Sequence, residues 1–207
     1  MTDLVYSVAD PAYAEAIVEL ELLCFPTIDP EHLLTIDDVF DQAEVFPEGA
    51  FIARDEDRVV GIASGIFVDY DLADVQHTLD DVLEDGIRSH DPDGEWYYGI
   101  DIAVHPEYRG RGIGKRMYEL RKQVVRDFGR RGIIAGGVLP GFKDHKDVMS
   151  ADAYVRAVAS GELFDATLSF QIANGFELLG VISGYVDDPQ ADGWASFIVW
   201  RNPDGPL

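Results

Sequence analysis

The chain has 207 residues, a length typical of one domain, and 47% of them are hydrophobic, as in an ordinary folded protein. Its 39 acidic and 16 basic side chains give a net charge of −23, so it repels nucleic-acid backbones. No apolar run is long enough to span a bilayer, no signal peptide opens the chain, and Cys24, the single cysteine, excludes an internal disulfide. We therefore expect a cytoplasmic protein with no nucleic-acid partner and no membrane contact.

The excess of acid along the chain has two interpretations. It is typical of a halophilic surface, adapted to salt that screens its self-repulsion, and this is the interpretation we prefer. The alternative is an electrostatic funnel that steers a cationic substrate.

We expect salt to stabilise the protein. Its thermal unfolding midpoint should rise by several degrees between about 0.1 M and multimolar KCl, because screening weakens the repulsion among surface carboxylates. Thermal melting across a salt series measures this, and equal midpoints at both ends would contradict salt adaptation.

The N-terminal third reads as a strand, two helices and a hairpin. Asp10 and Pro11 favour a helix start, since Asp caps helices and Pro is tolerated at the first helical position. Cys24 ends the apolar face of that helix, so we interpret it as a core residue rather than a reactive thiol. The expected elements are a strand at 5–7, a helix with the face Tyr13, Ile17, Leu20 and Cys24, a weaker helix at 36–43, and paired strands at 50–54 and 59–68.

Residues 69–95 form an acidic insertion without a clear period. It is too long for an ordinary loop, so we expect it to be partly helical, with one face made by Leu72, Val75, Leu79 and Val82. His77 and His90 lie near acids but match no standard ligand spacing, so no metal is predicted. The insertion is either a solvated, salt-adapted loop, which we prefer, or a surface that docks a protein.

The central feature is a strand at 96–104, a basic glycine-rich turn and a helix that ends at Gly129. Glycines at 110, 112 and 114 let the backbone bend sharply and approach a ligand closely. The first N–H groups of the helix have no helical partner, and with the helix dipole they form an anion site. Nearby positive charge predicts a pyrophosphate ligand; it comes from Arg109, Arg111, Lys115 and Arg116.

The remaining chain alternates helices and strands. A buried strand at 132–139 precedes a helical insertion at about 141–164, in which Ser150 caps a helix that stops at Gly161. Asp165 caps a shorter helix, and strands at 176–186 and 194–200 follow. The order predicts one mixed α/β domain over 1–207, with about seven strands and four or more helices.

Two common phosphate sites do not match the turn. A dinucleotide-binding site needs G-x-G-x-x-G and an acid about 20 residues on, but the glycines here fall as G-x-G-x-G and no acid stands at that distance. A P-loop needs Ser or Thr after Gly-Lys, but Arg116 follows Gly114-Lys115.

The turn resembles the acyl-CoA-binding motif of the GNAT (Gcn5-related N-acetyltransferase) superfamily. Arg109, Gly112 and Gly114 meet its R/Q-x-x-G-x-G/A pattern in full, and the strand and turn at 102–108 are also similar. The order of elements resembles the family over nearly the whole chain, up to Gly175-Phe176. Segments at 24–27, 91–94, 139–142 and 168–176 resemble the GNAT domain that some proteins fuse to a carbon–nitrogen hydrolase, although we expect no hydrolase domain in this chain.

The resemblance implies a donor site for acetyl-CoA in a V-shaped gap between the fourth and fifth strands. It implies that N–H groups in the turn hold the pyrophosphate, and that an N–H near Val104 stabilises the oxyanion. No metal is implied. The implied turn residues are Arg109, Gly110, Arg111, Gly112, Ile113, Gly114 and Lys115, and the pantetheine-binding backbone is that of Ile102, Ala103 and Val104.

The resemblance defines the catalytic groups less clearly than the acetyl-CoA site. Direct transfer needs a base for the ammonium and an acid for the leaving thiolate. Asp101 on the motif strand is the first candidate for the base, unless it is a structural acid, and Glu95 acting through water is the second. Gln171 stands where many family members have an acidic tyrosine, which leaves Tyr154 or solvent to supply the proton.

The sequence thus predicts an N-acetyltransferase that acts on a small-molecule amine or a protein amine. The alternative is a non-catalytic module that binds acyl-CoA and regulates a partner. A homodimer through the C-terminal strands is a family-level expectation. The acceptor is not identified.

Overall fold

The computed structural model describes residues 4–206 and contains one seven-stranded sheet in the order β1-β2-β3-β4-β5-β7-β6. Only β4 and β5 pair in parallel. The strands are β1 (Val5–Val8), β2 (Phe51–Asp55), β3 (Arg58–Val68), β4 (Trp96–Val104), β5 (Gly132–Val138), β6 (Glu177–Ile182) and β7 (Ala195–Arg201). This is the mixed α/β architecture that the sequence predicts.

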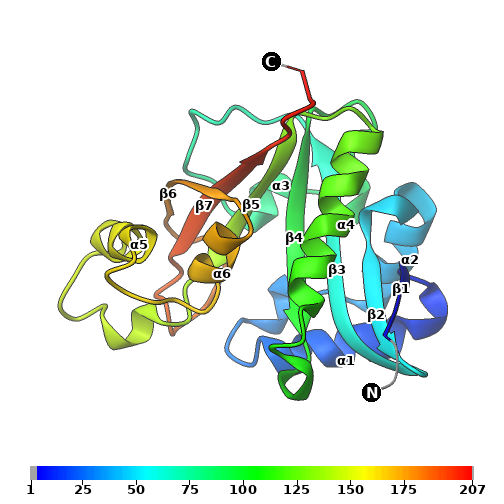
Figure 1. Ribbon diagram of the computed structural model, residues 1–207, viewed down its shortest axis with the longest axis horizontal. Coiled ribbons are helices and arrows are strands. Elements are labelled where there is room, and N and C mark those ends of the chain that lie inside the picture. The colour runs from blue at the N-terminus through cyan, green and yellow to red at the C-terminus, as the bar shows by residue number, and fades with distance from the viewer. Residues whose placement is uncertain (1–3, 207) are drawn as a thin grey trace.

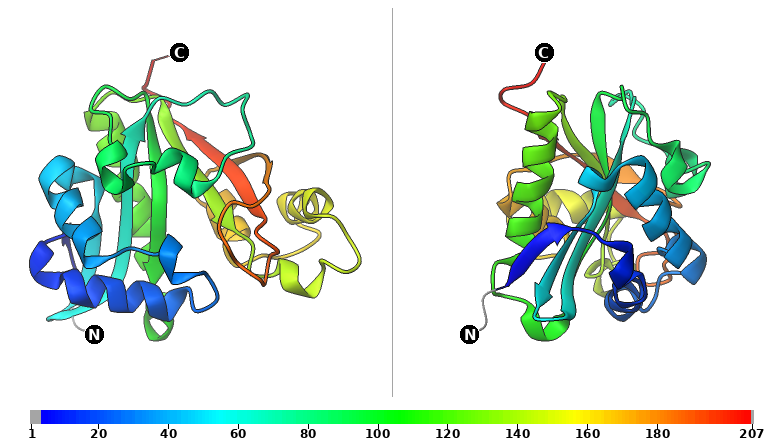
Figure 2. Two further views of the ribbon diagram at one scale, coloured as in Figure 1. Left: turned by 180° about the vertical axis from the view of Figure 1, so that it is seen from behind. Right: turned by 90° about the vertical axis from the view of Figure 1, so that its right-hand side faces the viewer.

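Helices cover both faces of the sheet (Figures 1 and 2). On one face lie α1 (Ala14–Cys24) and α2 (Ile36–Val45), which pack against each other and, through α1, against β3 and β4. On the other face lie α4 (Ile113–Asp127), α5 (Ala151–Ser160) and α6 (Leu168–Ala173). The core is therefore divided by the sheet, as in other layered α/β proteins.

Local sequence signals set most helix ends. Thr35 and Asp38 form a capping box at the start of α2, and Ser150 accepts a hydrogen bond from Ala153 N at the start of α5. Asp10 caps only a short 3-10 turn, Pro11–Tyr13, and α1 begins after it. The last strands are shorter than predicted, because the chain turns after Ile182 and returns at Ala195.

The acidic insertion contains only one short α-helix, α3 (Leu79–Val82), and a 3-10 turn, Gly86–Ser89. The predicted face through Leu72 and Val75 is wrong, because a capping box between Thr78 and Asp81 starts the helix at Leu79. Upstream, His77 holds the chain in place by hydrogen bonds to the Tyr70 and Tyr98 hydroxyls at 2.6 and 2.9 Å. The insertion packs Leu79 and Ile87 onto the sheet, so it belongs partly to the core.

Candidate active site

The site is a gap between β4 and β5. The two strands pair only from Trp96–Tyr98 to Gly132–Ile134, and beyond that point β5 pairs with β7 alone. A cavity of about 100 Å³ opens there, with residues 99–102 of β4 on one wall and residues 135–138 of β5 on the other. The V-shaped gap that the GNAT resemblance implies is therefore present.

A β-bulge in β4 shapes this gap. Ser64 pairs with Asp101 and Gly65 pairs with Gly99, so one extra residue of β4 lies between the pairs. Arg121 reaches the bulge from α4, is 2% exposed, and donates from Nη2 to the main-chain carbonyls of Ser64 and Asp101. The guanidinium thus satisfies two carbonyl groups at the bulge and links α4 to the wall of the gap.

Glycine is needed at the three positions of the turn for different structural reasons. Gly110 and Gly112 have φ of 77° and 82°, the left-handed region that favours glycine, and a Cβ at either would meet no atom within 4 Å. Gly114 has an ordinary φ, but its Cβ would lie 2.8 Å from the Phe170 ring on α6. Gly110 and Gly112 therefore leave an open cradle before α4, which fits a pyrophosphate, whereas Gly114 allows α4 to approach α6.

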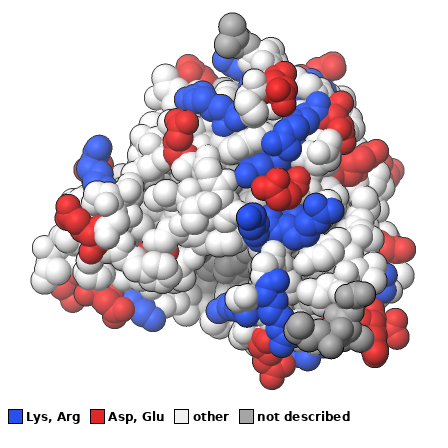
Figure 3. All heavy atoms as spheres, in the orientation of Figure 1, with Lys and Arg blue, Asp and Glu red and all other residues white. Residues whose placement is uncertain are grey.

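The arginines of the turn brace it. Arg109 Nε donates to Val104 O at 3.1 Å, and Arg111 Nη2 donates to Glu107 O at 3.1 Å with its guanidinium 4.5 Å from the centre of the Tyr108 ring. Ile113 is buried in the core, and Lys115 is exposed on the first turn of α4. Figure 3 shows basic side chains gathered over the α4 face of this acidic molecule, so an anionic ligand meets local positive charge there.

Replacing Gly112 by Ala is expected to raise the KM for acyl-CoA about tenfold, with a smaller effect on kcat. The left-handed conformation costs a residue with a Cβ about 1–2 kcal/mol, and about 1.4 kcal/mol corresponds to a factor of ten. Steady-state kinetics measure this change. Gly129→Ala is the matched control, since Gly129 has φ of 64° and free space around it but ends α4 far from the turn. Equal KM increases in both variants would contradict the cradle.

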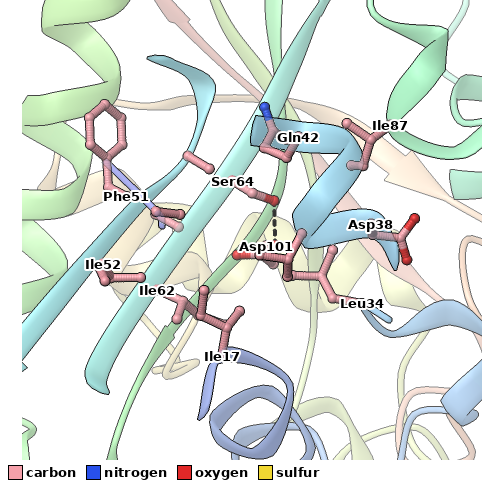
Figure 4. Close-up of a pocket in the computed structure, with 14 residues that line it drawn as sticks. Ile17, Leu34, Asp38, Gln42, Phe51, Ile52, Ile62, Ser64, Ile87 and Asp101 are labelled. Atoms are coloured by element: carbon pink, nitrogen blue, oxygen red, sulfur yellow. Dashed lines mark hydrogen bonds between the residues drawn. The ribbon is translucent and has the colours of Figure 1, made fainter. Parts of the chain in front are cut away.

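Asp101 lies in the gap as a buried acid, 7% exposed. The Ser64 hydroxyl donates to Asp101 Oδ2, whereas Oδ1 is buried without a hydrogen-bond partner among the described residues (Figure 4). Burial raises the pKa of Asp101, although the Arg121 charge and the hydrogen bonds from Ser64 oppose this rise. Asp101 also lines a second cavity of about 20 Å³, together with Leu34 and Gln42.

The structure does not bring Glu95 to the gap. Glu95 precedes the first residue of β4 and forms an exposed ion pair with Arg131 at 3.0 Å. Asp101 lies six positions further along the extended chain, a distance of about 20 Å. Of the two predicted acids, Asp101 lines the gap and Glu95 does not.

Gln171 lines the gap from α6 and is 3% exposed, and its Oε1 has no hydrogen-bond partner among the described residues. Tyr154, the suggested replacement acid, is buried elsewhere: its hydroxyl donates to Asp165 Oδ2 at 2.9 Å, and burial and that carboxylate raise its pKa. Cys24 Sγ lies 3.5 Å from Val104 O, half-buried, which agrees with a packing role.

An acid, a histidine and an arginine that line the gap were not predicted: Glu21, His32 and Arg121. Glu21 follows Ile17 by four residues on α1, and Arg121 follows Met117 by four residues on α4. A spacing of four places them on the apolar face of each helix. A charged residue on the apolar face of a helix is therefore the sequence signal by which Glu21 and Arg121 could have been found.

No group of His, Cys, Asp and Glu in residues 4–206 has a geometry that would hold a metal ion. His77 and His90 instead pack among aromatic side chains, and burial lowers the pKa of both. Over the same range, each helix is too short or too polar to cross a membrane.

The strand order and the gap between β4 and β5 match those that the GNAT resemblance implies. A family model described as "Acetyltransferase (GNAT) family" matches residues 14–140, and the chain belongs to this family. It is 37% identical over 195 residues to YhcX of Bacillus subtilis (strain 168), named a probable hydrolase, covering 92% of this chain and 37% of YhcX. It is 30% identical over 190 residues to YkwB of the same organism, named an uncharacterized N-acetyltransferase, covering 91% of this chain and 84% of YkwB.

A similar solved structure is the GphF GNAT-like decarboxylase in complex with isobutyryl-CoA. Its TM-score is 0.80 at 19% identity, and the match covers 97% of this chain and 99% of that chain. At this identity the likeness shows the fold. The chain spans 37% of the length of YhcX, so it corresponds to one part of that relative.

Proposed function

We propose that the protein is an N-acetyltransferase that moves an acetyl group from acetyl-CoA directly to a primary amine. The observation that carries this proposal is the buried, hydrogen-bonded carboxyl of Asp101 in the gap between β4 and β5. A further GNAT-fold structure, EctA from Paenibacillus lautus, was solved with L-2,4-diaminobutyric acid and coenzyme A. It has a TM-score of 0.59 at 15% identity over all of both chains, and it supports an amine as acceptor.

In this proposal the N–H groups of residues 109–114, with Lys115, hold the pyrophosphate at the start of α4. The backbone of Ile102, Ala103 and Val104 binds the pantetheine arm, and an N–H near Val104 stabilises the oxyanion. Asp101 accepts a proton from the bound ammonium, the amine nitrogen attacks the thioester carbon, and the C–S bond breaks. Gln171 has no titratable proton, so solvent protonates the thiolate.

The test measures thiol release from acetyl-CoA with a panel of small amines, peptides and no acceptor, in high salt. Amine-dependent thiol release with an equal amount of N-acetyl product supports the proposal. A parallel arm with malonyl-CoA detects decarboxylation, the activity named for GphF.

The second candidate is a non-catalytic acyl-CoA-binding module. It is favoured by Gln171, which stands where an acid would be expected and leaves a buried amide oxygen unpaired. Coenzyme A binding without turnover on any amine would select the module over the enzyme.

A further inference from the structure

Glu21 is a buried acid on α1 that no step above uses. It is 4% exposed, and its Oε2 accepts a hydrogen bond from the backbone N–H of Leu34 at 2.8 Å. Acidic side chains are almost never buried this deeply without a charged partner, because losing water costs them several kcal/mol. One backbone hydrogen bond compensates only part of that cost, so the position of Glu21 requires a further reason.

Glu21 and Asp101 line the same cavity from two elements. Glu21 comes from α1 and Asp101 comes from β4, and the charge of Asp101 raises the pKa of Glu21. Asp101 contributes the buried, unpartnered Oδ1 described above. The cavity is also lined by the apolar residues Phe25, Ile28, Leu33, Leu79 and Val186, and by His32. Two carboxyl groups thus face a small, mostly apolar space.

The charges around the pair define what it binds. Burial raises the pKa of Glu21 to about 9, and the charges of Asp101 and of Asp38 on α2 add to the rise. Arg121 on α4 counteracts the rise for Asp101. Of the other titratable groups that line the cavity, His32 lies 3.5 Å from Asp80, and burial raises the pKa of Tyr118 and of Tyr185. Burial and the neighbouring carboxyl therefore disfavour two negative charges on the pair at once. The complement of such a pair is a single cation with N–H donors.

We propose that Glu21 and Asp101 together form the ammonium-binding site of the acceptor, and that the acceptor is a small aliphatic primary amine. The inference rests on the proposed function and specifies its substrate class. One ammonium proton passes to the carboxyl pair, the nitrogen bonds to the thioester carbon, and the C–S electron pair goes to sulfur. The second nitrogen proton passes to solvent, which protonates the thiolate.

The size of the cavity supports a small acceptor. A water molecule needs about 10–15 Å³ of such space, so about 100 Å³ has room for on the order of seven water-sized groups. The acetyl thioester occupies several of these. What remains accommodates an ammonium with a short carbon chain, which the apolar walls cover.

The test uses the full chain and propylamine as the probe, with Glu21→Gln and the matched control Glu19→Gln. Glu19 lies on the same helix but is exposed. Glu21→Gln keeps an oxygen for the Leu34 N–H and is isosteric with the protonated acid, so we expect it to fold. It should lower kcat/KM for propylamine about 100-fold, with the KM for acetyl-CoA within twofold of wild type. Glu19→Gln should leave both values unchanged.

Calorimetric binding of propylammonium to the protein saturated with coenzyme A separates the inference from the proposed function. Turnover that Glu21→Gln leaves intact, or turnover on peptides but not on propylamine, overturns the inference and leaves the function standing. If wild type binds propylammonium without turnover and Glu21→Gln abolishes this binding, the ammonium site is supported and the proposed acetyltransferase function is overturned. No binding and no turnover in wild type overturns both. Should Glu21→Gln not fold, propan-1-ol binding as tightly as propylammonium to wild type overturns the inference.

Discussion

Replacing Asp101 by Asn is expected to lower kcat by about 100-fold or more, while the KM for acetyl-CoA changes little. General-base catalysis contributes about 10²–10⁴-fold, and Asn cannot accept the proton. Asn still accepts a hydrogen bond from the Ser64 hydroxyl at the same position, so the bulge should be preserved. Steady-state kinetics with the amine identified in the panel provide the measurement.

The pH dependence gives an independent readout of the same substitution. Burial raises the pKa of Asp101, and a base is active only above its pKa. The acid limb of kcat/KM should therefore lie above the usual Asp value of about 3.9 in wild type and disappear in Asp101→Asn. An unchanged kcat and pH profile would remove Asp101 from the mechanism.

Glu95→Gln is the matched control for Asp101→Asn. Both substitutions remove one carboxylate from the same stretch of chain, but Glu95 lies at the far end of β4 in an exposed ion pair with Arg131. Such pairs contribute about 0–1 kcal/mol, so stability and kcat should both stay close to wild type. A large loss of kcat in Glu95→Gln would restore the water-mediated role that the sequence suggested.

The parts of the site that the sequence predicts are those that a continuous segment specifies. The strand, the glycine turn and the start of α4 follow one another along the chain, and each has a local cause, such as the left-handed φ of Gly112. The fold class follows for the same reason, because alternating strands and helices are read from local periodicity. Asp101 could be placed beside the gap because it belongs to that segment.

The residues that were missed depend on contacts between distant segments. The spacing of Glu21 and Arg121 places them on the apolar faces of their helices, but only the packing of α1 and α4 against the sheet brings both to the gap. The prediction for the acidic insertion was wrong for a similar reason. Its helix face was inferred from spacing, but the hydrogen bonds of His77 to Tyr70 and Tyr98 fix the chain there. Tertiary contacts override local pattern at these places.

Replacing Arg121 by Met is expected to destabilise the protein by about 3 kcal/mol. The guanidinium donates to two buried carbonyl groups at the bulge, and hydrogen bonds from charged groups contribute about 1.5–3 kcal/mol each. For a chain of this size the unfolding midpoint should fall by roughly 6–12 °C. Met preserves most of the buried volume, so the loss reports the polar contacts rather than a cavity. Thermal or urea unfolding in high salt measures it.

Arg121→Met should also change the pH dependence of catalysis, because Arg121 donates to the main-chain carbonyl of Asp101. Its charge lowers the pKa of Asp101, so in Arg121→Met the acid limb of kcat/KM should move to higher pH. Arg126→Met is the control: Arg126 lies one turn further along α4, with its guanidinium 5.3 Å from the Trp200 ring, and its loss should cost about 0.5–1 kcal/mol. Arg121→Met could be destabilised no more than Arg126→Met, and the acid limb of its kcat/KM profile could stay in place. This result would show that the bulge holds its shape without the guanidinium. The opening between β4 and β5 would then be a property of the strands alone.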